Sequence, residues 1–303
     1  DYFCNQLTEL LTNYGEIFEV WFDGAKGSNA KKFEYDWQRY YDLIRKLQPK
    51  ANIAICGPDI RWVGNEGGKS RKSEYSVVPC ALREADRIMA LSQQDESQAS
   101  SLQKYNQTDE DLGSRKILEK NAYICWFPAE VDVSIRKGWF FHENDNRNSK
   151  SAKKLFKIYL NSVGNNCTLL LNIPPNAQGE IHKKDARNLK KLGKMIKNIT
   201  ANPIAYHELG ELTKDNGVLH LASNDTRKVN FVVLKEDITK SQRVELFDLY
   251  IKKANGKYKR VYKGTVIGAE KIINLKGRKA KGIRFVIRQS RSNPVIKSIG
   301  IYE

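Results

Sequence analysis

The sequence lacks any apolar run near the 18–20 residues that a membrane-spanning helix needs, so it predicts no transmembrane helix. Cysteine is scarce, and no two cysteines have the CxxC spacing of a zinc site or a thioredoxin-type redox site. We therefore expect no disulfide framework, and we expect Cys56 and Cys125, which lie in apolar runs, to be small core residues. Four histidines are too few and too dispersed to predict a metal cluster.

The 303 residues are enough for about two domains, and 40% apolar residues are enough for sizeable cores. The net charge of +17 is uneven: residues 1–150 hold 21 basic and 23 acidic residues, and residues 151–303 hold 31 and 12. The sequence contains no module in which basic residues are interleaved with exposed aromatic residues, so it does not predict nucleic-acid binding. We interpret the basic half as a solvated surface; the alternative is polyanion binding, whose affinity would fall steeply with salt.

Helices and short buried strands alternate over the first 200 residues. Apolar residues recur at helical spacing in four segments, which are 7–14, 37–47, 151–163 and 189–196. Short apolar runs predict buried strands at 17–22, 52–56, 122–127 and 167–173. This alternation favours an α/β fold, either a barrel or an open parallel sheet.

Near residue 210 the pattern changes to strands separated by turns. Six strand-like segments follow, at 229–234, 243–251, 258–262, 267–275, 282–287 and 295–302. Their short spacing predicts an antiparallel β-sandwich. We expect an α/β domain over residues 1–210 and a β-sandwich domain over residues 211–303.

Three acidic residues follow expected strands of the α/β domain: Asp23, Glu66 and Glu130. In a parallel barrel the carboxyl ends of the strands carry the active site. Two carboxylates flanked by tryptophans are the usual equipment for glycoside hydrolysis. Plainer interpretations remain open, with Asp23 as a helix cap, Glu66 as an exposed loop acid, Trp139 as a core aromatic and His142 as a local hydrogen-bonding group.

Several strings in one order resemble α-L-fucosidases of glycoside hydrolase family 29. They are QLTELLTNYG at 6–15, WFDGA at 21–25, GPDIRWVGNEG at 57–67, PAEVD at 128–132, GWFFH at 138–142 and LLLNIPPN at 169–176. The resemblance covers residues 1–200 strongly, and the sandwich resembles the family's C-terminal β domain more loosely. It implies a (β/α)8-like barrel whose C-terminal part is present here.

The resemblance also implies a retaining, metal-independent mechanism without a cofactor. Asp23 matches the family nucleophile at the end of the fourth barrel strand. Glu66 matches the acid/base of the subgroup specific for α-1,3/1,4-linked fucose on Lewis-type branched glycans. The two carboxyl groups of such a pair lie about 5–5.5 Å apart. Further candidates for lining the sugar pocket are Trp62, Glu130, Trp139, Arg61, Asp59 and His142.

The family barrel begins with about three further βα units, which carry a His-Trp pair and a Lys-His-His-Asp string that grip fucose. This sequence lacks them, so we expect residues 1–303 alone to be poorly active and to be either a fragment or completed by a companion chain. A kinetic assay of this chain on a fucosyl substrate tests that expectation. The sequence indicates no particular oligomeric state.

The function implied is exo-hydrolysis of terminal α-L-fucose from a fucosylated oligosaccharide or glycoconjugate. The alternative is a non-catalytic glycan-binding protein built on a degenerate fucosidase fold. Replacing Asp23 by Ala separates the two, because it abolishes hydrolysis in an enzyme and leaves binding intact in a lectin. Bacterial relatives imply a periplasmic or secreted location, although no signal-peptide pattern stands at Asp1.

Overall fold

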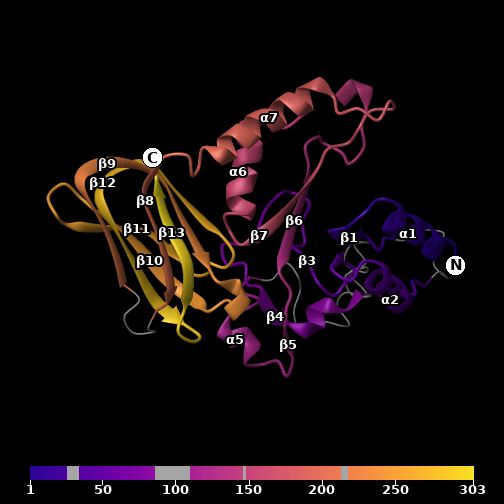
Figure 1. Cartoon of the computed structure of the whole chain (residues 1–303), viewed down its shortest axis with the longest axis horizontal. Helices are drawn as coiled ribbons and strands as arrows, with labels where there is room; N and C mark the ends of the chain where they lie inside the picture. The colour runs from indigo at the N-terminus through magenta and orange to yellow at the C-terminus, as the bar shows by residue number, and fades with distance from the viewer. Residues whose placement is uncertain (26–33, 86–109, 146–147, 213–217) are drawn as a thin grey trace. The chain divides into compact units, whose positions relative to one another are not determined.

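A computed structural model describes residues 1–25, 34–85, 110–145, 148–212 and 218–303 (Figure 1). The chain forms two compact units. The first consists of residues 1–64 and 77–129, and the second of residues 65–76 and 130–303. No helix among the described residues is long and apolar enough to cross a membrane.

The first unit begins with a helix–strand–helix–strand succession, as the sequence predicts. Its elements are α1 (Tyr2–Asn13), β1 (Glu19–Phe22), α2 (Trp37–Leu47) and β2 (Asn52–Ile55). The strands β1 and β2 pair in parallel, with Phe22 opposite Ile55. Asp36 caps α2, because its carboxylate accepts a hydrogen bond of 3.3 Å from the backbone N–H of Arg39.

Aromatic packing holds α2 against β1. The ring centroid of Phe22 lies 5.7 Å from the ring centroid of Trp37 and 6.3 Å from that of Tyr40. Ile44 and Ile53 are fully buried in the same cluster. The helical period of α2 and the continuous apolar character of β2 therefore serve one core.

The rest of the first unit contains one error of the sequence interpretation. Its elements are β3 (Arg61–Trp62), β4 (Val77–Pro79), the 3-10 helix η1 (Cys80–Arg83), α5 (Arg115–Leu118) and β5 (Ile124–Trp126). The run 122–127 is not a buried parallel strand, because β5 pairs antiparallel with β4 and leaves Ile124 51% exposed. Apolar content alone does not reveal whether a short strand has both faces covered.

The second unit contains a strand that the sequence interpretation missed, β6 (Ala129–Ser134), all of whose residues are buried. Apolar and polar side chains alternate along β6, so its sequence does not resemble a continuous apolar run. It is followed by η2 (Glu143–Asp145), α6 (Ala152–Ser162), β7 (Cys167–Asn172) and α7 (Lys183–Lys197). β6 and β7 are neighbours in one sheet.

Six strands form one hydrogen-bonded sheet in the C-terminal part, coloured orange to yellow in Figure 1. They are β8 (Pro203–Glu211), β9 (Val218–Glu236), β10 (Val244–Lys252), β11 (Tyr258–Gly264), β12 (Lys271–Ser290) and β13 (Val295–Tyr302). Their order is β11-β10-β12-β9-β13-β8, and the pairings resolved between them are antiparallel. One apolar core, which includes Phe247, Phe285 and Ile299, draws on strands across the sheet.

The strands of this sheet differ from the expected ones in two ways. Segments 267–275 and 282–287 contribute to a single strand, β12, whose register with β9 shifts between Asn274 and Arg278. Such shifts let one long strand bend, so turn-like residues inside it mimic a break in the sequence. β8 was not expected, and it places residues 203–211 in the sheet. The domain boundary at residues 210 and 211 stays a prediction.

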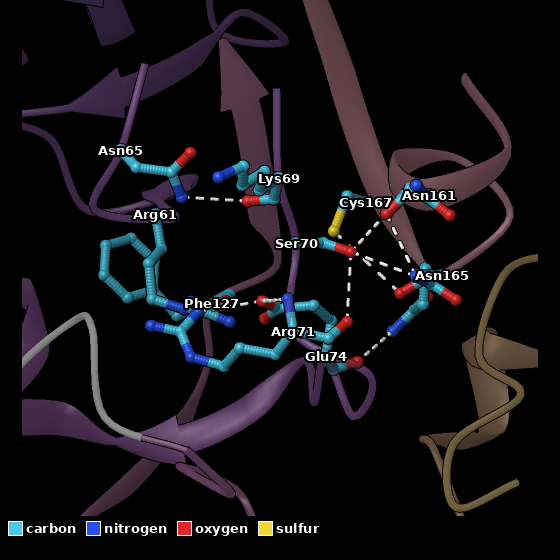
Figure 2. Close-up of polar contacts among 11 residues, drawn as sticks. Arg61, Asn65, Lys69, Ser70, Arg71, Glu74, Phe127, Asn161, Asn165 and Cys167 are labelled. Atoms are coloured by element: carbon cyan, nitrogen blue, oxygen red, sulfur yellow. Dashed lines mark hydrogen bonds and ion pairs between the residues drawn. The ribbon is translucent and has the colours of Figure 1, made fainter. Parts of the chain in front are cut away.

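Residues 65–76 belong to the second unit although they precede β4 in the chain. Ser70 donates to the backbone carbonyl of Asn161, and Asn165 Nδ2 donates to Ser70 Oγ over 3.1 Å. Figure 2 shows the Ser70 hydroxyl between Asn161 and Asn165. The carboxylate of Glu74 binds the guanidinium of Arg71 over 2.8 Å, with both side chains buried.

The same segment is bound to the C-terminal sheet. Ser76 N donates to Gln242 Oε1 over 2.8 Å, and the hydroxyls of Ser73 and Thr265 are hydrogen-bonded. Asn166, which precedes β7, connects the two sides: its Nδ2 donates to the carbonyl of Glu74 over 2.8 Å, and its Oδ1 accepts from Ala269 N over 2.8 Å. Its φ of 68° is in the left-handed region, which asparagine tolerates better than most residues.

We expect N166A to lower the free energy of unfolding by about 2–4 kcal/mol. The reason is the loss of buried hydrogen bonds worth about 1 kcal/mol each, together with about 1 kcal/mol for alanine at a positive φ. Urea denaturation measures this loss. The matched control is N198A, at an exposed asparagine after α7, which should change stability by less than about 0.5 kcal/mol. Equal effects of the two substitutions would show that Asn166 does not link the parts of this unit.

Candidate active site

Asp23 lies directly after β1, at the carboxyl end of a parallel strand pair, and its side chain is exposed. Next to it, Cys56 N donates to the carbonyl of Phe22 over 3.2 Å, and Cys56 Sγ donates to the carbonyl of Asp23 over 3.4 Å. Burial raises the pKa of the Tyr35 phenol, and the negative charge of Asp23 raises it further. The strand pair therefore fixes the backbone of Asp23 and leaves its carboxylate open to solvent.

The turn after β2 contains one residue with an unusual backbone conformation, Ile55, and one acidic residue that binds its neighbours, Asp59. Ile55 has a φ of 68°, which is rare for a β-branched residue, and its N–H donates to the carbonyl of Ile60 over 2.9 Å. Asp59 accepts a hydrogen bond of 2.7 Å from Ile53 N and forms an ion pair with Arg45. Asp59 thus holds the turn; its expected role in sugar binding stays a prediction.

Arg61 and Trp62 follow this turn in β3. Arg61 is fully buried, and its Nε donates to the carbonyl of Phe127 over 3.3 Å, as Figure 2 shows. Its backbone N–H donates to the carbonyl of Pro128 over 2.8 Å. Trp62 is half-buried and packs against the core of the first unit. Both roles in the sugar pocket stay predictions.

The second expected carboxylate, Glu66, is paired with an expected aromatic residue. The indole Nε1–H of Trp139 donates to Glu66 Oε2 over 3.1 Å, and the Glu66 side chain is exposed. The two residues are far apart in the sequence but lie in the same compact unit. The sequence interpretation singled out both residues without pairing them.

Side chains at the ends of β6 and β7 hold the loop that carries Trp139. Asn172 Nδ2 donates to the carbonyl of Trp139 over 2.9 Å and to Ser134 Oγ over 3.1 Å. Ser134 Oγ donates in turn to the carbonyl of Gly138 over 2.7 Å. Sequence reasoning missed the positioning roles of Asn172 and Ser134; the available signal was a polar residue at the end of each strand.

A buried ion pair anchors the same loop to α7. Arg136 Nε and Asp185 Oδ2 are 2.8 Å apart, and both side chains have no exposed surface. The guanidinium of Arg136 also lies over the Phe141 ring, 4.5 Å from its centroid. Asp185 is in the first turn of α7, where a negative charge is favourable. The sequence interpretation missed this pair because an ion pair between distant residues leaves no periodic signal.

An open hollow of about 1010 Å³ lies beside this loop. His142, which is exposed, is part of its lining, together with Phe140, Phe141 and Asn176. Glu130 lies elsewhere: it is in β6 and only 1% exposed. The sugar-binding roles of His142 and Glu130 stay predictions.

The structure thus pairs Glu66 with Trp139 in one unit, whereas Asp23, Asp59, Arg61 and Trp62 belong to the other. The carboxyl separation of about 5–5.5 Å expected for Asp23 and Glu66 stays a prediction. Among the described residues, no group of three or more His, Cys, Asp or Glu side chains is arranged to hold a metal ion.

Comparison with solved structures defines the class of the fold. A proposed alpha-L-fucosidase from Bacteroides ovatus is 42% identical, with a TM-score of 0.85, over 100% of this chain and 51% of its own. A glycoside hydrolase family 29 member from an unknown rumen bacterium is 33% identical, with a TM-score of 0.80, over 99% and 53%. The expected fold class is confirmed: an α/β part that covers the C-terminal portion of a (β/α)8-like barrel, followed by an antiparallel β-sandwich.

The family follows from the sequence matches. The family model for alpha-L-fucosidase matches residues 1–200, and Alpha-L-fucosidase 1 of Arabidopsis thaliana is 32% identical over 100% of this chain. This chain belongs to the alpha-L-fucosidase family, which confirms the resemblance inferred from its motifs. It spans 61% of the Arabidopsis protein and about half of the two structural relatives.

We expect D185N to lower the free energy of unfolding by about 3–5 kcal/mol, because it removes the negative charge that pairs with the buried guanidinium of Arg136. Chemical denaturation provides the measurement. The control is R227A, which removes a pair with Glu303 whose side chains are 49% and 40% exposed, and it should cost less than about 1 kcal/mol. A D185N protein as stable as R227A would contradict this anchoring role.

Proposed function

We propose that the protein carrying this chain is a retaining exo-α-L-fucosidase with Asp23 as the nucleophile and Glu66 as the acid/base. The observation that best supports this proposal is the hydrogen bond from Trp139 to Glu66. It joins two of the sequence motifs that resemble those of the family, at a carboxylate that is exposed. Membership of the alpha-L-fucosidase family supports the substrate sugar. The WVGNE string supports a preference for α-1,3/1,4-linked fucose.

The proposed reaction runs in two steps. The Asp23 carboxylate attacks C1 of fucose while protonated Glu66 gives its proton to the departing glycosidic oxygen, which forms a fucosyl ester on Asp23. Glu66, now a carboxylate, then takes a proton from water as the water attacks C1 and releases Asp23. Two inversions at C1 retain the α configuration. The indole N–H of Trp139 supports this cycle by orienting the Glu66 carboxylate between the two proton transfers.

Substitution of the two carboxylates separates their roles. We expect E66A to reduce turnover of a fucosylated oligosaccharide about 10²–10⁴-fold, because its poor leaving group needs general acid assistance. An aryl α-fucoside with an acidic phenol should still form the fucosyl ester, and added azide should release α-fucosyl azide. D23A with azide should give the β anomer, because only one displacement remains. NMR of the azide product reads the anomer.

Three outcomes contradict this proposal. If E66A with azide gives the β anomer, Glu66 is not the acid/base. If D23A retains normal hydrolysis, Asp23 is not the nucleophile; if unmodified protein binds a fucosylated glycan without cleaving it, the glycan-binding alternative holds. The matched control is E119Q, at an exposed glutamate that follows α5, and it should leave all rates unchanged.

Trp139 gives a second test. We expect W139F to lower kcat/KM about 10- to 100-fold, because a hydrogen bond to a charged group is worth about 1.5–3 kcal/mol. Steady-state kinetics on a fucosylated oligosaccharide, whose leaving group needs general acid assistance, measures the change. W126F is the control, at a partly exposed tryptophan of β5, and it should stay within about twofold of the unmodified enzyme. Equal rates for W139F and unmodified enzyme would contradict the orienting role of the indole.

The preferred glycan and the location of the protein are part of the same proposal. Fucosylated oligosaccharides or glycoconjugates are the proposed substrates, and a periplasmic or secreted location remains the prediction from bacterial relatives. Competition between Lewis-type trisaccharides and an α-1,2-linked fucoside for one enzyme sample would measure the linkage preference.

A further inference from the structure

Two of the five cysteines come together on one short β-ladder. β4 and β5 pair antiparallel, with Val78 opposite Cys125. The ladder continues one step beyond its last strand pair, because Cys80 N donates to the carbonyl of Tyr123 over 3.1 Å. Cys80 and Cys125 are therefore diagonal neighbours, and both lie in the first unit.

Diagonal neighbours of this kind have their side chains on the same face of the ladder. The Cys80 thiol contributes to a raised pKa of the Cys125 thiol, in keeping with two neighbouring side chains. Diagonal Cα atoms stand about 7–8 Å apart, which is beyond the roughly 4.4–6.8 Å that a disulfide usually spans. Closing the disulfide therefore requires a backbone shift, and this shift falls at Cys80, where β4 ends and η1 begins.

The surroundings distinguish this pair from the other cysteines. Cys80 and Cys125 are both half-buried, whereas Cys4, Cys56 and Cys167 are buried. Cys125 is therefore not the core residue that the sequence suggested. Exposure to solvent gives a small oxidant access to the pair, and the buried thiols lack that access.

We propose that Cys80 and Cys125 form a reversible disulfide, made by thiol–disulfide exchange with a small-molecule disulfide of the oxidised glutathione class. The bond closes residues 81–124 into a covalent loop and fixes β5 to the end of β4. The proposal is independent of the fucosidase function.

The exchange balances in two steps. The Cys80 thiol loses its proton to solvent, its thiolate attacks one sulfur of the oxidant, and one glutathione thiolate leaves, which gives a mixed disulfide on Cys80. The Cys125 thiol then loses its proton, its thiolate attacks the Cys80 sulfur, and the second glutathione thiolate leaves. The two cysteines lose two electrons and two protons, and the oxidant gains two electrons and becomes two thiols.

The order of the steps follows from the environment of Cys125. Burial raises the pKa of the Cys125 thiol to about 12, and its hydrogen bond with Cys80 contributes to the increase. Cys125 is therefore protonated at neutral pH, which disfavours it as the thiol that attacks the oxidant first. If the second step limits the rate, ring closure should accelerate about tenfold for each unit by which the pH is raised, as long as the pH stays below this pKa. The reason is that the thiolate fraction of Cys125 grows in that proportion.

The bond would act on a segment that supports the candidate site. Arg83, at the end of η1, donates to the carbonyl of Trp126, and its guanidinium lies 5.4 Å from the centroid of the Phe127 ring. Phe127 in turn supplies the carbonyl that binds Arg61. The disulfide would therefore restrain the backbone that holds Arg61.

Redox-controlled peptide mapping tests the proposal. The folded chain is equilibrated in mixtures of oxidised and reduced glutathione, free thiols are blocked with iodoacetamide, and tryptic peptides are analysed by mass spectrometry. We expect a linked Cys80–Cys125 peptide that has lost the mass of two hydrogen atoms and that disappears under reduced glutathione. Cys4, Cys56 and Cys167 should stay thiols. In C125S, Cys80 should accumulate as the glutathione adduct, whereas C4A should form the link as the unmodified protein does.

Each remaining outcome overturns the proposal. These outcomes are a stable Cys80 glutathione adduct in the unmodified protein, links that involve any of the three buried cysteines, and alkylated Cys80 and Cys125 at every glutathione ratio. The test remains decisive even if a variant fails to fold, because the unmodified chain provides the linked peptide.

Discussion

The second unit depends on buried polar contacts that fix residues 65–76 between α6 and the C-terminal sheet. Asn166 binds this segment at the carbonyl of Glu74 and the sheet at Ala269 N. A buried amide that loses such partners has no water to replace them, so the arrangement tolerates one geometry only. Because Glu66 lies near the start of this segment, the β-sandwich supports the loop of the proposed acid/base.

A second set of contacts positions the Glu66 carboxylate itself. Trp139 reaches Glu66 from the loop after β6, and this loop is held by Asn172 and by the ion pair of Arg136 with Asp185. A catalytic carboxylate on an exposed loop must keep one orientation through two proton transfers. The supporting residues lie on strand ends and on α7, which are more rigid than the loop itself.

The sequence was most informative where structure is local or where motifs are long. The helix at 37–47 and the strands around Phe22 and Ile55 follow from periodicity and apolar runs, and the family follows from strings such as WFDGA. Polar residues inside β6 hid a fully buried strand, and the bulged residues of β12 made one strand resemble two. The diagonal placement of Cys80 and Cys125 on one ladder could not be predicted, because it depends on strand pairing across a long separation in the chain.

The sequence by itself determined the first helix–strand–helix–strand succession, the family and the choice of candidate carboxylates. These depend on residue type and local spacing, which a linear chain displays directly. Only the tertiary structure decided that Trp139 donates to Glu66, that Asp59 is committed to Arg45 and Ile53, and that Arg136 and Asp185 share a buried site. Such partners are chosen by the packing of distant segments, where a buried polar group accepts whichever partner the fold brings within hydrogen-bond distance.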